Sequence, residues 1–117
     1  MGAVLALLCN QVFAQEHAEK IRELVIVDGA LPAGERLIKV LKGDRLRWRI
    51  TSNQPGEVHL HAYRLHVQLQ PGLPGEMAFT AFATGRFRLE WHAAAAQAAS
   101  AASHQVSPLA MFEVRPR

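Results

Sequence analysis

The segment that decides the fold is Lys42-Gly43-Asp44-Arg45-Leu46-Arg47-Trp48-Arg49-Ile50. Its first three residues are typical of a turn, and the rest alternates cationic with apolar side chains. Successive side chains of a β-strand point to opposite faces, so Leu46, Trp48 and Ile50 would face a core while the three arginines face solvent. The alternation therefore predicts a half-buried β-strand rather than a helix.

Outward from this strand, turn residues separate further short segments of extended character. Gly34, the Pro71-Gly72-Leu73-Pro74-Gly75 cluster and Gly85 mark boundaries between them. The predicted strands cover residues 23–28, 37–40, 46–50, 77–82, 86–92 and 111–114, together with one long extended segment at 58–69. About seven short strands without a strong helical period predict a single-domain, all-β sandwich. The alanine-rich stretch 93–103 is interpreted as either a short helix or a loop.

The charge balance argues against nucleic-acid binding. Such binding calls for a basic stripe interleaved with stacking aromatic residues. Here 13 Lys and Arg stand against 10 Asp and Glu, the net charge is +3, and aromatic residues make up 7% of the 117 residues. The solvent face of the strand at 46–50 accounts for the one close group of arginines. We therefore expect no nucleic-acid partner.

Residues 1–14 differ from the rest of the chain. An apolar run from Gly2 to Cys9 leads to Val12-Phe13-Ala14, which resembles the −3 and −1 positions of a signal-peptidase site. We expect cleavage after Ala14, leaving residues 15–117 as an exported, periplasmic domain, although no cationic residue precedes the run. The run is too short to span a bilayer, so no membrane span is expected. The alternative is a buried N-terminal strand or helix.

Cys9 is the only cysteine in the chain. Its removal with residues 1–14 would leave a domain without disulfides or thiolate ligands, in which nitrogen and oxygen would have to hold any metal. The new N-terminus, Gln15-Glu16-His17, would be able to wrap Cu(II) in amine, amide and imidazole nitrogens in a square plane. The alternative is a chance histidine near the start, and cyclisation of Gln15 would remove the amine.

Six histidines occur, and the spacing of several suggests a metal site. His59 and His61 are two residues apart, so in a strand both imidazoles project from one face, roughly 7 Å apart. His92 ends a predicted strand and His104 precedes the last one, so both belong to a connection of the kind where function gathers. His66, at an odd offset from the pair, is expected on the opposite face. The alternative is a pair of surface histidines or one satisfied core histidine.

Together these segments resemble the cupredoxin family. Lys42-Gly43-Asp44 before a strand is similar to the family's "K-G-D" segment, and Glu57-Val58-His59-Leu60-His61-Ala62-Tyr63 resembles the strand that carries the first copper histidine. Pro71-Gly72 and then Gly85-Arg86-Phe87 are similar to the pattern leading into the ligand loop, and Phe112-Glu113-Val114 to the closing strand. The resemblance covers residues 36–116 and implies a cupredoxin-like Greek-key β-sandwich.

The resemblance also implies a copper site and the residues that would form it. The family places one histidine on an early strand, here His59 or His61, and then a cysteine, a second histidine and often a methionine before the last strand. His92 stands at the cysteine's place, His104 matches the later histidine, and Pro108 stands where the methionine would be. The implied metal ligands are His59, His61, His92 and His104, without the thiolate that blue copper requires.

This resemblance implies a periplasmic copper carrier or buffer, with copper as its cofactor and another exported or membrane copper protein as its partner. The alternative is a metal-free, cupredoxin-like interaction module for which the fold is only a scaffold. We expect no enzymatic activity. An enzyme would need an open metal position plus a general acid or base, and Glu90 is the only acidic residue near the late histidines.

Overall fold

The computed structural model describes residue 2, residues 18–95 and residues 107–117. Apart from residue 2, the predicted signal segment 1–14 lies outside the described residues, as do His17, His104 and most of the alanine-rich stretch. Within them the strands are β1 (Lys20–Ile26), β2 (Leu37–Leu41), β3 (Arg45–Ser52), β4 (Gly56–Leu60), β5 (Leu65–Leu69), β6 (Gly75–Thr80), β7 (Gly85–Ala93) and β8 (Ser107–Arg115), with a single 3-10 turn at Ala33–Glu35.

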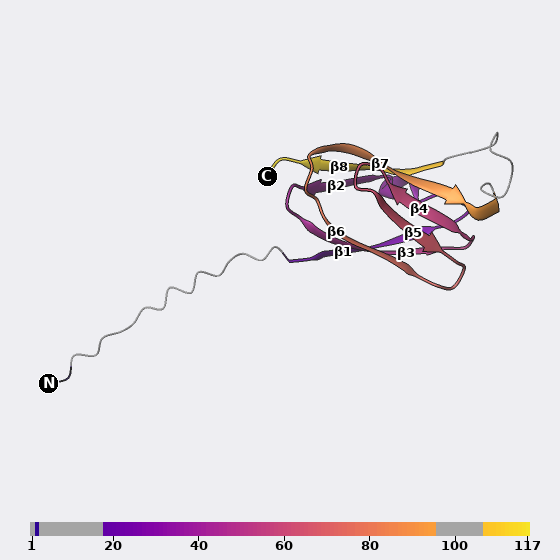
Figure 1. The fold of residues 1–117 in the computed structure, drawn as a ribbon, viewed down its shortest axis with the longest axis horizontal. Helices are drawn as coiled ribbons and strands as arrows, with labels where there is room; N and C mark the ends of the chain where they lie inside the picture. Colours follow the sequence, from indigo (N-terminus) through magenta and orange to yellow (C-terminus); the bar gives the residue numbers. More distant parts are fainter. Residues whose placement is uncertain (1, 3–17, 96–106) are drawn as a thin grey trace.

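The strands form two sheets that face each other across a core (Figure 1). One sheet has the order β1-β3-β6 and the other the order β2-β8-β7-β4-β5. The pairs β1–β3 and β2–β8 are parallel, and the other pairs are antiparallel. Among the described strands, only β4–β5 and β7–β8 follow one another within one sheet. The predicted all-β sandwich is therefore confirmed.

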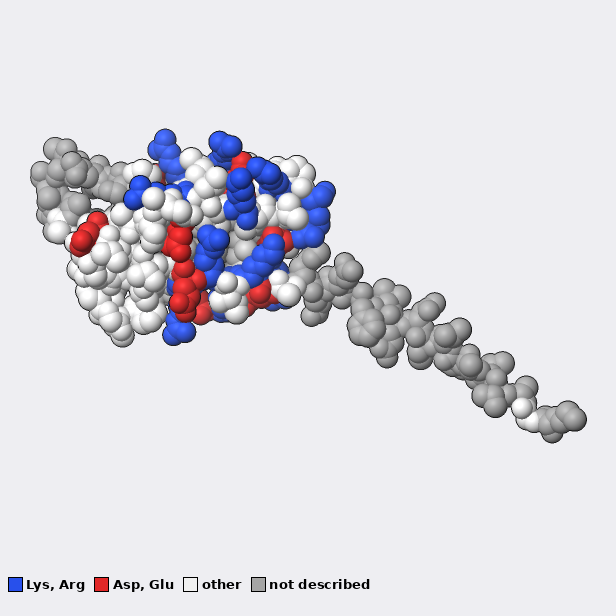
Figure 2. Space-filling view, turned by 180° about the vertical axis from the view of Figure 1, so that it is seen from behind, with Lys and Arg blue, Asp and Glu red and all other residues white. Residues whose placement is uncertain are grey.

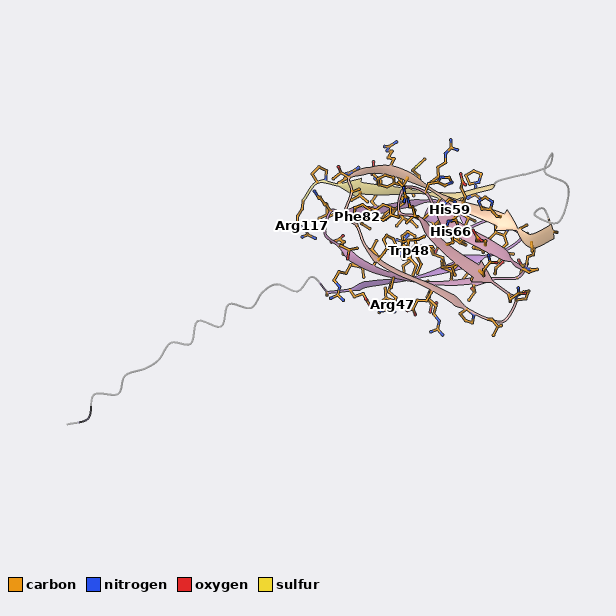
Figure 3. The ribbon with its side chains drawn as sticks, viewed as in Figure 1. Arg47, Trp48, His59, His66, Phe82 and Arg117 are labelled. Atoms are coloured by element: carbon orange, nitrogen blue, oxygen red, sulfur yellow. The ribbon has the colours of Figure 1, made fainter. Side chains whose placement is uncertain are left out.

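The alternating strand that led the sequence argument is β3, and it behaves as predicted. Leu46, Trp48 and Ile50 are buried, and Trp48 lies between the two sheets (Figure 3). The Trp48 ring packs edge-on against Phe112 of the opposite sheet, with 5.2 Å between ring centroids. The alternating arginines lie on the outer face, where Arg47 forms ion pairs with two glutamates. Burial of this apolar row ties the two sheets together.

One predicted element is wrong. Residues 58–69 do not form a single extended segment, because β4 ends at Leu60 and β5 begins at Leu65. The four residues between them make a turn in which Ala62 and Arg64 have φ angles of 68° and 55°. Left-handed backbone of this kind is usually marked by Gly or Asn. Since neither residue occurs here, the sequence contains no signal for the turn.

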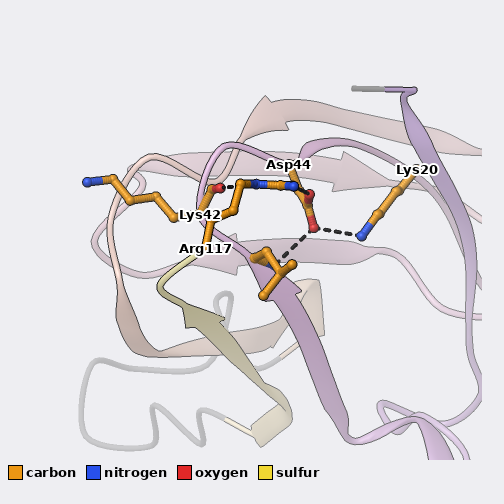
Figure 4. A network of polar contacts seen from close by, with 5 residues as sticks. Lys20, Lys42, Asp44 and Arg117 are labelled. Atoms are coloured by element: carbon orange, nitrogen blue, oxygen red, sulfur yellow. Dashed lines mark hydrogen bonds and ion pairs between the residues drawn. The ribbon is translucent and has the colours of Figure 1, made fainter. Parts of the chain in front are cut away.

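Asp44, just before β3, joins several distant parts of the chain (Figure 4). Its side chain is 2% exposed. Its Oδ2 accepts hydrogen bonds from Lys20 Nζ at 2.7 Å and from the backbone N–H of Leu41 at 2.9 Å, and its Oδ1 accepts one from Arg117 Nη2 at 2.6 Å. Burial acts to raise the pKa of Asp44, but the hydrogen bonds from Lys20 and Leu41 and the nearby Arg117 outweigh it. The pKa therefore lies below its ordinary value of 3.8.

Acidification is expected to weaken the fold through this carboxylate. A group whose pKa is lower in the folded than in the unfolded state contributes stability above its unfolded pKa, and loses it as the pH falls through the folded value. We expect the free energy of unfolding, measured in urea, to decrease between about pH 4 and pH 2. The decrease should be smaller in Asp44→Asn. It should not vanish, because Glu19 and Glu113 also have lowered pKa values. Equal pH slopes in the two proteins would contradict this role.

Charged side chains are unevenly spread over the surface. Seen from the side opposite to Figure 1, Lys and Arg gather over the part of the domain where β1 begins, with Asp and Glu among them (Figure 2). Several of the cations are paired, including Arg86 and Arg115 with Glu113. Among the described residues, no helix has the length and apolar character needed to cross a membrane.

Candidate metal centre

Three neighbouring strands of the five-stranded sheet carry a cluster of polar side chains. β4 lies between β5 and β7, and its register places His59 opposite His66 on β5 and opposite Glu90 on β7. Directly opposed residues share one face of a sheet. Val58 and Leu60, on either side of His59, are fully buried in the core. His59, His66 and Glu90 therefore lie on the outer face of the sheet, and Figure 3 shows the two histidines side by side.

The expected opposite-face position of His66 is wrong. Its ring stacks on that of His59, with 4.0 Å between centroids and 12° between the ring planes. The predicted position assumes alternation along an unbroken strand, whereas the turn after Leu60 reverses the chain. Cross-strand pairing then decides which face a residue occupies. His66 Nδ1 also lies 2.5 Å from Glu57 Oε1, so His66 belongs to the cluster.

His61 reaches the cluster from the turn after β4, not from a strand. Its backbone N–H donates to the carbonyl oxygen of Arg88 at 3.0 Å, and its ring centroid lies 4.2 Å from that of His59. Tyr63 anchors the same turn, because its Oη donates to the carbonyl oxygen of Ala83 at 3.0 Å. Burial raises the pKa of Tyr63, which keeps the hydroxyl a donor. The rings of His59 and His61 thus lie together, although His61 projects from a turn that Tyr63 holds in place and not from the strand that the sequence predicted.

Glu90 lies within the cluster, although the sequence argument did not count it as a ligand. Its side chain is 7% exposed, and its Oε2 is 2.5 Å from His61 Nε2 and 3.5 Å from His92 Nε2. One potential ligand atom from each of His59, His61 and Glu90 lies within 4.8 Å of the other two. Glu90 precedes His92 by two residues on β7 and so shares its face. That spacing is the signal that would have found it.

His92 adds a further imidazole at the edge of the cluster. Its ring centroid lies 6.0 Å from that of His59. Its Nε2 is buried and has no hydrogen-bond partner among the described residues, and the 3.5 Å approach to Glu90 does not meet hydrogen-bond geometry. A buried nitrogen without a partner is costly unless something binds it. Its neighbour Trp91 packs so tightly on Gly56 that a Cβ there would lie 2.5 Å from the indole ring, which holds β4 against β7.

The electrostatics favour a neutral imidazole at the centre of the cluster. Burial lowers the pKa of His59, and the nearby His66 and His61 lower it further, while Glu90 acts in the opposite direction. A neutral imidazole keeps a lone pair that a metal can accept. His59 therefore offers a lone pair to a metal ion at the centre of the cluster.

The donor set fits a metal ion in type and nearly fits it in size. Imidazole nitrogen and carboxylate oxygen bind at about 2.0–2.2 Å, so two ligand atoms on one ion are at most about 4.4 Å apart. The ligand atoms of His59, His61 and Glu90 lie within 4.8 Å of one another. Side-chain movements of about half an ångström would bring them to metal-binding distance. An open cavity of about 680 Å³ adjoins the cluster and is lined by His59, His61, Arg88, Glu90, His92 and Pro108. Pro108 supplies no donor side chain.

Of the residues predicted as ligands, the structure brings His59, His61 and His92 into one cluster, while His104 lies outside the described residues. The cluster's position differs from the expected loop end of the sandwich. It occupies the outer face of the five-stranded sheet, because alternation along β7 turns Trp91 into the core and His92 away from it.

Comparison with known proteins finds matches among solved structures only. No protein-family model matches the sequence, and no curated protein matches it. A solved heme-copper terminal oxidase dimer is 20% identical with a TM-score of 0.63, over 86% of this chain and 68% of that one. A multicopper oxidase is 20% identical with a TM-score of 0.60, over 84% of this chain and 42% of that one. A Cu-containing nitrite reductase from Thermus scotoductus SA-01 is 22% identical with a TM-score of 0.55, over 86% of this chain and 28% of that one.

The chain has the cupredoxin fold. At these identities the likeness shows the fold alone, and this cupredoxin domain spans less than half of the multicopper oxidase and of the nitrite reductase. The prediction that the protein is not an enzyme is contradicted by the same matches, which are named as oxidases and a reductase. The cupredoxin fold is one on which such enzymes are built, so the sparse acidic residues near the late histidines did not justify excluding them.

Proposed function

We propose that the protein binds copper through His59, His61 and Glu90 and serves as a copper carrier or buffer. The convergence of these three donors within 4.8 Å on a cupredoxin fold is the observation that carries the proposal. His92, whose Nε2 is buried without a partner among the described residues, is the fourth donor of the site. His104 remains a predicted ligand from the connection before β8. The similar solved structures are named as copper proteins, which favours copper over other metals that imidazole binds.

The donor chemistry favours Cu(II). Imidazole and carboxylate suit the oxidised ion, whereas thiolate and thioether would favour Cu(I). No thiol occurs among the described residues, since Cys9 is the only cysteine of the chain. The proposal includes export with loss of residues 1–14, which rests on the apolar run before Ala14.

Titration of the protein with Cu(II) tests this function directly. The titration is to be made with the His17→Ala variant, which lacks the second, N-terminal copper site that the sequence suggests. We expect one ion per chain, nitrogen hyperfine structure in the EPR spectrum, and no intense absorption near about 600 nm, where copper–thiolate sites absorb. The double change His59→Ala and His61→Ala should weaken binding by more than about a hundredfold, because it removes two of the three converging donors.

Far-UV circular dichroism of the double variant checks that the sandwich still forms. If a folded double variant bound copper as tightly as the parent, the proposed site would be wrong. The cluster would then be a hydrogen-bonded surface network, and the protein would be better explained as a metal-free interaction module. An intense blue colour would also contradict the proposal.

A further inference from the structure

We propose that the cavity beside the histidine cluster binds a small organic carboxylate with an apolar group, and that Arg88 is the cation that recognises it. This inference rests on the proposed function, since a carboxylate is expected to approach the copper site from the same cavity.

The size of the cavity is the first argument. Its volume is about 680 Å³, whereas a water molecule takes about 30 Å³ of liquid and a single metal ion needs no more. Cavities of about 300–1,000 Å³ are the size at which proteins hold small organic molecules. The metal site therefore leaves most of this space for another ligand.

Arg88 has no close counterion among the described residues, which is the second argument. Its side chain is 71% exposed, and among the described residues its one ion pair is a 3.9 Å approach to Glu90 Oε1, which is too long for a hydrogen bond. Arg86, two residues earlier on the same face of β7, is paired with Glu113 at 3.0 Å. If Glu90 is a metal ligand, the ion offsets its charge and Arg88 is left without a counterion. A planar guanidinium matches a carboxylate in two parallel hydrogen bonds.

Arg88 is also held in register with the site. Its carbonyl oxygen accepts the hydrogen bond from the backbone N–H of His61 at 3.0 Å, and its strand carries Glu90 and His92 onto the same face. Arg88 lines the cavity from the same strand that supplies two of the donor side chains, and an anion site is best built on such a regular element.

An adjoining cavity gives the ligand its apolar part. This second space, of about 290 Å³, shares Arg88 and Pro108 with the first, continues over Leu109, Ala110 and Met111, and is bordered on another side by Arg36. Met111 is half-buried, and a methionine side chain adapts readily to irregular apolar surfaces. A carboxylate held at Arg88 would thus place an attached aliphatic or aromatic group against Pro108 and Met111. Formate or a halide would leave this surface unused.

The test is a calorimetric titration of the full chain, loaded with Cu(II), with benzoate, acetate and the uncharged benzamide. EPR of each sample confirms that copper is bound and reports whether the anion perturbs it. We expect benzoate to bind at least about threefold more tightly than acetate, from burial of its ring, and benzamide not to bind. Arg88→Gln should weaken benzoate binding by at least about fivefold, whereas copper affinity should not fall, because the change removes a cation that lies 3.9 Å from Glu90. Arg86→Gln is the matched control and should have no effect.

The outcomes separate this inference from the function on which it rests. Loss of benzoate binding in Arg88→Gln alone supports the inference. Equal losses in the Arg86 and Arg88 variants would reduce the effect to overall charge and overturn it, as would a copper-loaded protein that ignores benzoate. Equal affinity for acetate and benzoate would overturn the assignment of the apolar cavity. Failure to load copper would instead refute the proposed function, and this inference with it.

Discussion

Copper(II) affinity is expected to fall by about a hundredfold, or about 2.7 kcal/mol, when Glu90 is replaced by glutamine. Glutamine keeps the shape of the side chain but removes the negative charge and one strong oxygen donor. Glu90 supplies the anionic member of the three converging donors, and its side chain is 7% exposed, so water screens its attraction for a cation weakly. Isothermal titration in the His17→Ala background measures the change.

Glu57→Gln is the matched control for this prediction. Glu57 lies on the same face of β4, two residues from His59, but contacts His66 and Gln68. We expect its replacement to change copper affinity by less than about threefold, because it is not among the converging donors. Equal losses in the two variants would mean that the general negative charge of this face, and not ligation by Glu90, attracts the ion.

The largest expected effect on stability comes from Phe112→Ala, which should cost about 4 kcal/mol. Phe112 is fully buried, and its ring meets Trp48, Tyr63 and Phe79 at centroid distances of 5.2, 5.7 and 5.6 Å. These rings come from both sheets and from the turn that carries His61. A cavity at this point would loosen the contact between the sheets and consume much of a small domain's stability. Urea denaturation measures the loss.

If the alanine variant does not fold, Phe112→Leu keeps the prediction testable, with an expected loss of about 1.5 kcal/mol. Phe82→Ala is the control, since Phe82 is 61% exposed, although its ring centroid lies 4.5 Å from that of Tyr63. We expect it to cost less than about 1 kcal/mol. A similar loss for Phe82 and Phe112 would show that the aromatic cluster is not the centre of the core.

The sequence by itself determined the fold class and the approximate positions of most strands. The row of Leu46, Trp48 and Ile50 and the corresponding alternation in β7 are local patterns, because a strand's side chains alternate whatever it pairs with. Turn residues with distinctive chemistry, such as the Pro71–Gly75 cluster, ended strands in a readable way. The turn with Ala62 and Arg64 at positive φ carried no such mark, and it is the turn that was missed.

The sequence indicated His59, His61 and His92 as candidate ligands, but only the tertiary structure showed that His66 and Glu90 lie beside them. His59 meets His66 and Glu90 through the registers of β4 with β5 and with β7. In sequence, β5 and then β6 of the other sheet lie between β4 and β7. Local periodicity says which residues of one strand share a face, but it contains no information on which residue of another strand lies opposite. Pairing between distant segments sets that choice, because a slip of one residue moves a whole row of side chains to the other face.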